Sequence, residues 1–194
     1  MKAVLVIFVA VFAALSLWHG TQAARSDASA LHARWVVNEW RDGNGPTYTP
    51  QLWRETLADL QAALQTAPGN AQLLDDIGFL YAARQQYLEA AASYRAATTL
   101  RPTFPYSWAY LALAKHLQGQ RDAEFWRAFD KALQYGTNEA GVQPTLGQIA
   151  FAQWPALGAD RQRRITQMVT TAQAASKTRL LAMAKQNGVT LASQ

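Results

Sequence analysis

The chain has 194 residues, of which half are hydrophobic and 16% are charged, with 18 basic and 13 acidic side chains. This length suits one domain or one short helical solenoid with a continuous core. The absence of cysteine excludes disulfides, cysteine-ligated zinc, thiol nucleophiles and an N-terminal lipid-modified cysteine.

The N-terminal part of the chain, residues 1–24, is expected to be a membrane-targeting segment. After Lys2, the run from Ala3 to Trp18 has no charge and no polar side, which a helix facing water would need. Its length lies between that of a signal-peptide core and a full membrane span. We therefore interpret residues 1–24 as a signal peptide or a transmembrane anchor.

Two fates of this segment stay open. The small residues around Ala23 would suit a signal peptidase, and cleavage there would release a soluble protein. Trp18 is a residue type that lies at membrane interfaces, which points to an uncleaved anchor in the inner membrane through residues 3–24. In either case Lys2 keeps the N-terminus inside, so residues 25–194 are expected to lie in a bacterial periplasm.

A repeat with a regular spacing of roughly 34 residues follows. The recurring positions are Leu60, Tyr94 and Phe129; Ala63, Ala97 and Ala132; Pro68 and Pro102; and Leu74, Ile77 and Gly78 with Trp108, Leu111 and Ala112. A glycine inside a helix costs about 1 kcal/mol relative to alanine, so Gly78 needs a packing reason. Small residues where two antiparallel helices approach closely would supply it.

This pattern resembles the tetratricopeptide repeat (TPR) family, whose unit has the same length. Residues 71–104 carry the match through Leu74, Ile77, Gly78, Tyr81, Ala90, Tyr94, Ala97 and Pro102. Residues 105–138 match less completely and lack the closing proline. The resemblance implies an all-α fold, a TPR-like superhelix of helical hairpins with about seven to nine helices over residues 25–194.

Further helices are expected on both sides of the two best repeats. Residues 28–40 and 53–68 would form one pair, joined by a turn-rich linker that contains the sequence DGNG. Residues 142–151 and 161–175 would form another pair. Asp160 is expected to cap the second helix of that pair, at its N-terminus.

A longer resemblance covers most of the chain. The apolar start, the tryptophan-rich first helix, the repeat pair and the final RLLAMAKQNG are similar to the small TPR proteins of bacterial exopolysaccharide biosynthesis loci, the VpsP-like group. It implies a non-catalytic interaction scaffold of the cell envelope, serving exopolysaccharide biosynthesis or export. The alternatives are a periplasmic adaptor for pilus or outer-membrane assembly and, in another class, a polysaccharide- or peptidoglycan-processing enzyme.

No pattern in the sequence predicts catalysis, a cofactor or a metal. The histidines, His19, His32 and His116, lack the spacing of metal ligands. The DGNG sequence at 42–45 begins like a calcium loop but runs into Pro46, which indicates a turn. We therefore expect no enzyme activity, cofactor or metal, and export argues against a nucleic-acid partner.

Two surfaces are candidates for binding. In TPR proteins the first helices of the repeats line a concave groove, and the matching positions here are Gln72, Asp75, Phe79, Ala83, Tyr106, Ala109, Leu113, His116 and Leu117. We expect this lining to take an amphipathic helix from an envelope protein, unless the C-terminal helix near residues 180–184 fills it.

The second candidate surface is basic. Residues 25–155 hold 11 basic and 12 acidic side chains, whereas residues 156–194 hold 6 and 1. Arg161, Arg163 and Arg164 are therefore candidates for contact with an anionic surface, such as lipid headgroups or an acidic polymer. The alternative is that they are only a solvated helix end.

Overall fold

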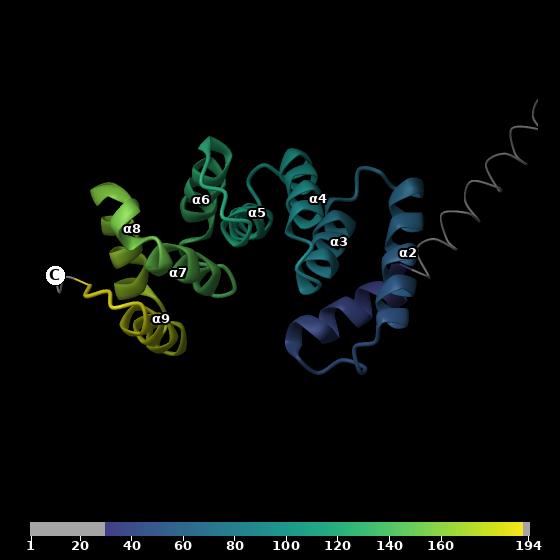
Figure 1. Ribbon diagram of the computed structural model, residues 1–194, viewed down its shortest axis with the longest axis horizontal. Coiled ribbons are helices and arrows are strands. Elements are labelled where there is room, and N and C mark those ends of the chain that lie inside the picture. Colours follow the sequence, from purple (N-terminus) through teal and green to yellow (C-terminus); the bar gives the residue numbers. More distant parts are fainter. Residues whose placement is uncertain (1–29, 192–194) are drawn as a thin grey trace, which may run out of the picture. The chain divides into compact units, whose positions relative to one another are not determined.

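The computed structural model describes residues 30–191 (Figure 1), so the predicted targeting segment lies outside the described residues. Within this range all regular structure is helical and no strand occurs, which confirms the all-α class. The described chain divides into two compact units, one up to Leu80 and one from Tyr81 onward, with the boundary inside a helix.

The helices follow one another with short connections. A helix over residues 30–42 is followed by α2 (Pro50–Thr66), α3 (Ala71–Ala83), α4 (Tyr87–Leu100), α5 (Pro105–Leu117), α6 (Ala123–Gly136), α7 (Gln143–Ala152), the 3-10 turn η1 (Trp154–Ala156), α8 (Gly158–Thr171) and α9 (Ala174–Gln186). Residues 71–104 and 105–138 thus contain two helices each, and the first helices of the two pairs begin 34 residues apart, at Ala71 and Pro105.

Local chemistry explains several of these boundaries. The side chain of Thr49 accepts a hydrogen bond from the backbone N–H of Leu52 and caps α2, and Asp122 caps α6 in the same way through Phe125. Pro105 at the start of α5 has no N–H to leave unsatisfied, so it suits the first turn of a helix. These caps satisfy backbone groups that would otherwise lack partners.

The C-terminal region departs from the expectation at α8. The prediction that Asp160 caps this helix is wrong, because α8 begins at Gly158 and Asp160 lies in its first turn. The 3-10 turn η1 leads into the helix, and Gly158 adopts a positive φ of 73° that glycine tolerates. The helix also ends at Thr171, so the predicted continuation to residue 175 is interrupted before α9.

In the first unit, the helix over residues 30–42 buries Ala33, Val36 and Val37. Spacings of three and four residues put these side chains on one side of the helix. The indole N–H of Trp53 in α2 donates to the carbonyl oxygen of Leu80, at 2.9 Å. This buried hydrogen bond connects α2 with α3 and satisfies the polar atom of a buried tryptophan.

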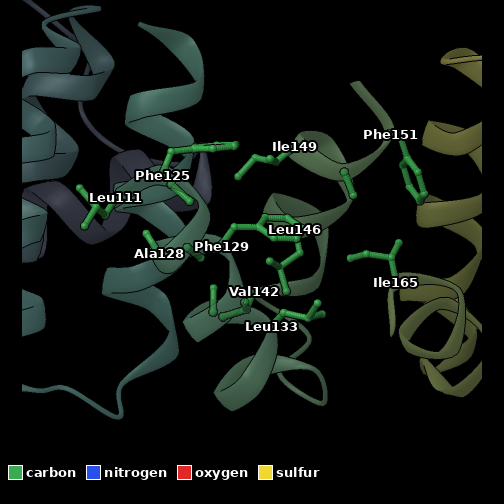
Figure 2. Close-up of a cluster of buried hydrophobic side chains, with 14 of the residues drawn as sticks. Leu111, Phe125, Ala128, Phe129, Leu133, Val142, Leu146, Ile149, Phe151 and Ile165 are labelled. Atoms are coloured by element: carbon green, nitrogen blue, oxygen red, sulfur yellow. The ribbon is translucent and has the colours of Figure 1, made fainter. Parts of the chain in front are cut away.

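In the second unit, the core is built around α6 and α7 (Figure 2). The buried residues of α6 are Phe125, Ala128, Phe129, Ala132, Leu133 and Gly136, which recur at helical spacing on one side. Figure 2 shows Phe129 directed toward Leu146 of α7, with Ile165 of α8 beyond. Burying each large apolar side chain contributes about 1.5–3 kcal/mol to folding, which makes this cluster the main source of stability here.

Neighbouring helices in the second unit meet through small residues. The helix α5 packs against α4, α6 and α7, and α7 also contacts α8 and α9. Ala90 of α4 and Ala112 of α5 are both fully buried, as expected of small residues at close helix contacts. Gly147 of α7 lies so close to α9 that an added Cβ would stand 2.6 Å from Leu180 Cδ2.

Candidate interaction surfaces

One side of α5 carries a row of large side chains that are only partly covered. Tyr106, Tyr110, Leu113 and Leu117 follow one another at spacings of four, three and four residues, so they lie along the same side of the helix. The first three are half-buried, and Leu117 is 42% exposed. We call these four residues the α5 row.

Aromatic neighbours fix the first half of the α5 row. The ring of Tyr106 lies 5.2 Å from that of Phe104 and 6.4 Å from that of Tyr110, measured between centroids. Tyr110 in turn lies 5.5 Å from Tyr94 of α4. These tilted contacts, in the range favoured by aromatic pairs, hold the rings in place without covering them fully.

The loop between α6 and α7 borders the row at Tyr106. An added Cβ on Gly141 would stand 2.9 Å from this ring, so a larger residue there would require the ring to shift. The phenol oxygen lies 3.5 Å from Glu139 Oε2. Burial and the charge of Glu139 raise the pKa of Tyr106 above that of an ordinary phenol, which is itself protonated at neutral pH.

Two of the predicted groove residues on α5 are not part of this row. Ala109 is 1% exposed and belongs to the core. The imidazole of His116 stacks with Phe125 of α6 at 6.4 Å between centroids. Burial, together with the positive charge of Arg121, lowers the pKa of His116, so it is neutral at pH 7. Tyr110 was not among the predicted groove positions, although its spacing of four residues from Tyr106 places it on the same side of the helix.

The predicted groove positions on α3 face other parts of the chain. In the first unit the guanidinium of Arg41 lies 4.9 Å above the ring of Phe79 and donates to the backbone oxygen of Asp75, at 3.3 Å. Asp75 is buried, and Gln72 Nε2 lies 3.4 Å from Asp76 Oδ1. These residues are therefore engaged within the unit.

Ala83 and the C-terminal helix complete the predicted groove set. Ala83 is the last residue of α3, lies in the second unit and is exposed. Leu180 of α9 is fully buried in the core of the second unit, where its Cδ2 lies close to Gly147 of α7. The α9 helix thus packs against α7 and α8.

The three arginines near the start of α8 have different surroundings. Arg161 forms a bidentate ion pair with Asp130 of α6, at 2.7 and 2.8 Å, and its guanidinium lies 4.4 Å from the ring of Trp126. The hydrogen bond to Asp130 raises the pKa of Arg161. Arg163 pairs with Asp160 three residues earlier, and both side chains are about 70% exposed. Such an exposed pair contributes little to stability.

Arg164 lines a hollow of about 550 Å³ at the start of α8. The other lining residues are Asp130, Gln134, Leu157, Gly158, Ala159, Asp160 and Arg161. The hollow contains two arginines and two aspartates, so its charge is balanced. Of the three arginines that are candidates for contact with an anionic surface, only Arg163 is exposed, whereas Arg161 and Arg164 are half-buried.

A polar network that the sequence did not reveal joins α4, α5 and α6. Lys115 is 3% exposed, and its Nζ contacts Asp122 at 2.9 Å and Glu124 at 2.8 Å. Arg95 contacts the same Glu124 carboxylate at 2.5 and 2.8 Å. Burial acts to lower the pKa of Lys115, but its bonds to the two carboxylates outweigh this and the pKa is raised. The network is fully paired, which is typical of structural charges.

None of the helices between residues 30 and 191 combines the length and the apolar composition that a membrane span requires. The same residues contain no cluster of three or more histidine, aspartate or glutamate side chains that could hold a metal ion. No family model matches the sequence, and no curated protein is significantly similar to it.

Proposed function

We propose that this protein is a non-catalytic interaction scaffold of the bacterial cell envelope, built from TPR-like helical hairpins. The observation that carries the proposal is the α5 row on the first helix of a hairpin, in which three half-buried aromatic and leucine side chains pack on the core and lead to the exposed Leu117. The recurrence of the first helices after one repeat length, at Ala71 and Pro105, supports the repeat architecture. Partly exposed large apolar residues in line are typical of a surface that binds a partner.

The partner that fits the α5 row is one short amphipathic helix. From Tyr106 to Leu117 the row advances eleven residues, which corresponds to about 16 Å along a helix, or three turns. A partner helix with apolar residues at spacings of three and four would cover it. The tyrosines would supply large, rigid contact areas, and the Tyr106 hydroxyl could bond to a polar group at the rim.

The proposed location is the periplasmic side of the inner membrane, with residues 3–24 as the anchor. The uncharged run after Lys2 supports this location, and the resemblance to the VpsP-like group supports a role in exopolysaccharide biosynthesis or export. An alkaline-phosphatase fusion after Gln194 is expected to be active in a bacterial host. An active cytosolic reporter at the same position would contradict the proposed topology.

The binding proposal is tested by crosslinking followed by titration. A photo-crosslinking amino acid at Leu117 is expected to capture an envelope protein in cells, whereas the same probe at Leu88, which is 68% exposed on α4, is not. The captured segment is then made as a peptide and titrated against the purified protein. Tyr106→Ala combined with Leu113→Ser should weaken its binding at least about tenfold. Because both side chains also pack against the core of the second unit, the melting temperature should fall modestly while the variant stays folded.

Other outcomes would contradict the proposal. A large fall in melting temperature for the double variant would show that the α5 row is internal core. Equal crosslinking at Leu117 and Leu88 would show that the row is not a specific surface. Turnover of glycans or peptidoglycan by the purified protein would favour a processing enzyme instead.

A further inference from the structure

The helix over residues 30–42 exposes two large apolar side chains. Leu31 is 64% exposed and Trp35 is 51% exposed, and their spacing of four residues puts them on the same side of the helix. His32 stacks with Trp35 at 5.9 Å between ring centroids. Exposed leucine and tryptophan side by side leave a small apolar surface in contact with water.

The helix cannot easily turn to bury these side chains. On its other side, Ala33, Val36 and Val37 are in the core. Arg34 Nε lies 3.3 Å from Asp76 Oδ2, and Arg41 Nη1 lies 2.8 Å from Asp76 Oδ1; this aspartate is 1% exposed. The two ion pairs to this buried carboxylate thus hold the helix against α3 and fix its orientation about its own axis.

The exposed side changes character along the helix. Its apolar residues lie at the N-terminal end, whereas Asn38 and Asp42, further along, are exposed and polar. Leu31 also lines a hollow of about 270 Å³ in the first unit, together with Ala30, Arg34, Ala63, Ala67, Asn70 and Leu73. The apolar surface is therefore concentrated at the end of the helix that follows the targeting segment in the sequence.

The chain length limits how far this surface can lie from the apolar run. Thirteen residue steps separate Trp18 from Leu31. Even a fully extended chain would keep their Cα atoms within about 45 Å of each other. If the run from Ala3 to Trp18 stays in the membrane, Leu31 and Trp35 are held near the lipid surface at high effective concentration.

We infer that Leu31 and Trp35 rest in the interface of the membrane that holds the anchor, as a second, peripheral contact with lipid. Tryptophan favours this region because its ring is apolar and its indole N–H can bond to water or headgroups. A shallow apolar contact beside an anchor would fix the orientation of the first unit relative to the bilayer. The inference rests on the proposed function, because it requires residues 3–24 to be an uncleaved anchor.

The absence of cysteine makes the experiment direct. Single-cysteine variants Leu31→Cys and Trp35→Cys of the full chain are labelled with an environment-sensitive fluorophore and reconstituted into phospholipid vesicles. Leu88→Cys, at a similarly exposed leucine, and Asn38→Cys, at the polar end of the same side, are the controls. We expect nitroxide-bearing lipids to quench the labels at 31 and 35 roughly threefold more than the label at 88. Iodide in water should show the opposite order.

The outcomes separate this inference from the proposed anchor. Mass spectrometry of the membrane fraction from cells first shows whether the N-terminus is intact. An intact, membrane-bound chain whose labels at 31 and 35 are quenched only by iodide overturns the lipid contact alone. Labels shielded from both quenchers indicate a protein contact and also overturn it. Cleavage near Ala23 overturns the anchor and, with it, the inference.

Discussion

Lys115 at the end of α5 and Glu124 at the start of α6 form a short ion pair, with 2.8 Å between Nζ and Oε2. Glu124 also accepts two hydrogen bonds from Arg95 of α4, so one carboxylate joins three consecutive helices. The side chain of Glu124 is 20% exposed and that of Lys115 only 4%. Removing a single member would leave a nearly buried charge with fewer partners. Such a change destabilises a protein more than removal of the whole network does, because the remaining charge is no longer compensated.

Glu124→Ala is therefore expected to lower the free energy of unfolding by about 2–3 kcal/mol, less than for a fully buried pair because water reaches part of the carboxylate. Urea denaturation followed by circular dichroism measures the change. The matched control is Arg163→Ala, which removes an ion pair whose side chains are both about 70% exposed. It should change stability by no more than about 0.5 kcal/mol. Equal effects of the two variants would contradict the structural role of Glu124.

The same carboxylate predicts how stability depends on acid pH. Its two hydrogen bonds with Arg95, and then the one with Lys115, lower the pKa of Glu124 to about 2 from an ordinary 4.5. The unfolded chain therefore takes up a proton near pH 4.5 while the folded chain does not. The stabilisation is complete above pH 4.5 and is lost as the pH falls toward 2. Between these values the urea midpoint should fall more steeply for the natural protein than for Glu124→Gln. Parallel curves would show that Glu124 is not the group responsible.

Two glycines allow a comparison of close approaches in the second unit. An added Cβ on Gly136 would stand 2.8 Å from both Pro105 Cβ and Val142 Cγ1, and these groups are stiff. On Gly147 it would meet Leu180 Cδ2 at 2.6 Å, the end of a flexible side chain. Gly136→Ala should therefore cost about 1–3 kcal/mol by overpacking. Gly147→Ala should cost less, because alanine gains about 1 kcal/mol in a helix interior and Leu180 can shift. Thermal denaturation of both variants gives the order, and the reverse order would contradict this account.

Local features of the fold were readable from the sequence. The helix pairs of residues 71–104 and 105–138 follow from spacings within one repeat and from Pro102 and Pro105, which act on neighbouring backbone. Tyr110 was equally readable, since it stands four residues from Tyr106. The start of α8 was missed because a 3-10 turn precedes it, and a side-chain cap at Asp160 was the simpler expectation.

Contacts between distant residues were not readable in this way. Arg161 and Asp130 are 31 residues apart, and Arg34 and Asp76 are 42 apart. Either arginine could have paired with any acidic residue that the packing brought near it. Helical spacing defines which side of a helix a residue occupies, but the partner helix is chosen by tertiary packing. For this reason charge counts identified a basic C-terminal region but not its internal ion pairs.

The ion pair of Arg161 leads to the last prediction, which separates structural arginines from surface arginines. Arg161→Gln loses the bidentate bond to Asp130 and the stacking on Trp126. Because both partners are partly exposed, this should lower the free energy of unfolding by about 1–2 kcal/mol. Arg163→Gln should change it by no more than about 0.5 kcal/mol.

Binding to an anionic surface would give the opposite ranking. Sedimentation with vesicles rich in anionic lipid, compared with neutral vesicles, measures it for the same variants. If the start of α8 contacts lipid headgroups, the exposed Arg163 should matter most, and added salt should weaken the binding of the natural protein. Arg163→Gln would then reduce sedimentation while leaving the melting temperature unchanged. Arg161→Gln would mainly lower the melting temperature and have a smaller effect on sedimentation. Sedimentation that is insensitive to both salt and Arg163→Gln would mean that these arginines make no contact with an anionic surface, because salt must screen an exposed cation in contact with a charged surface.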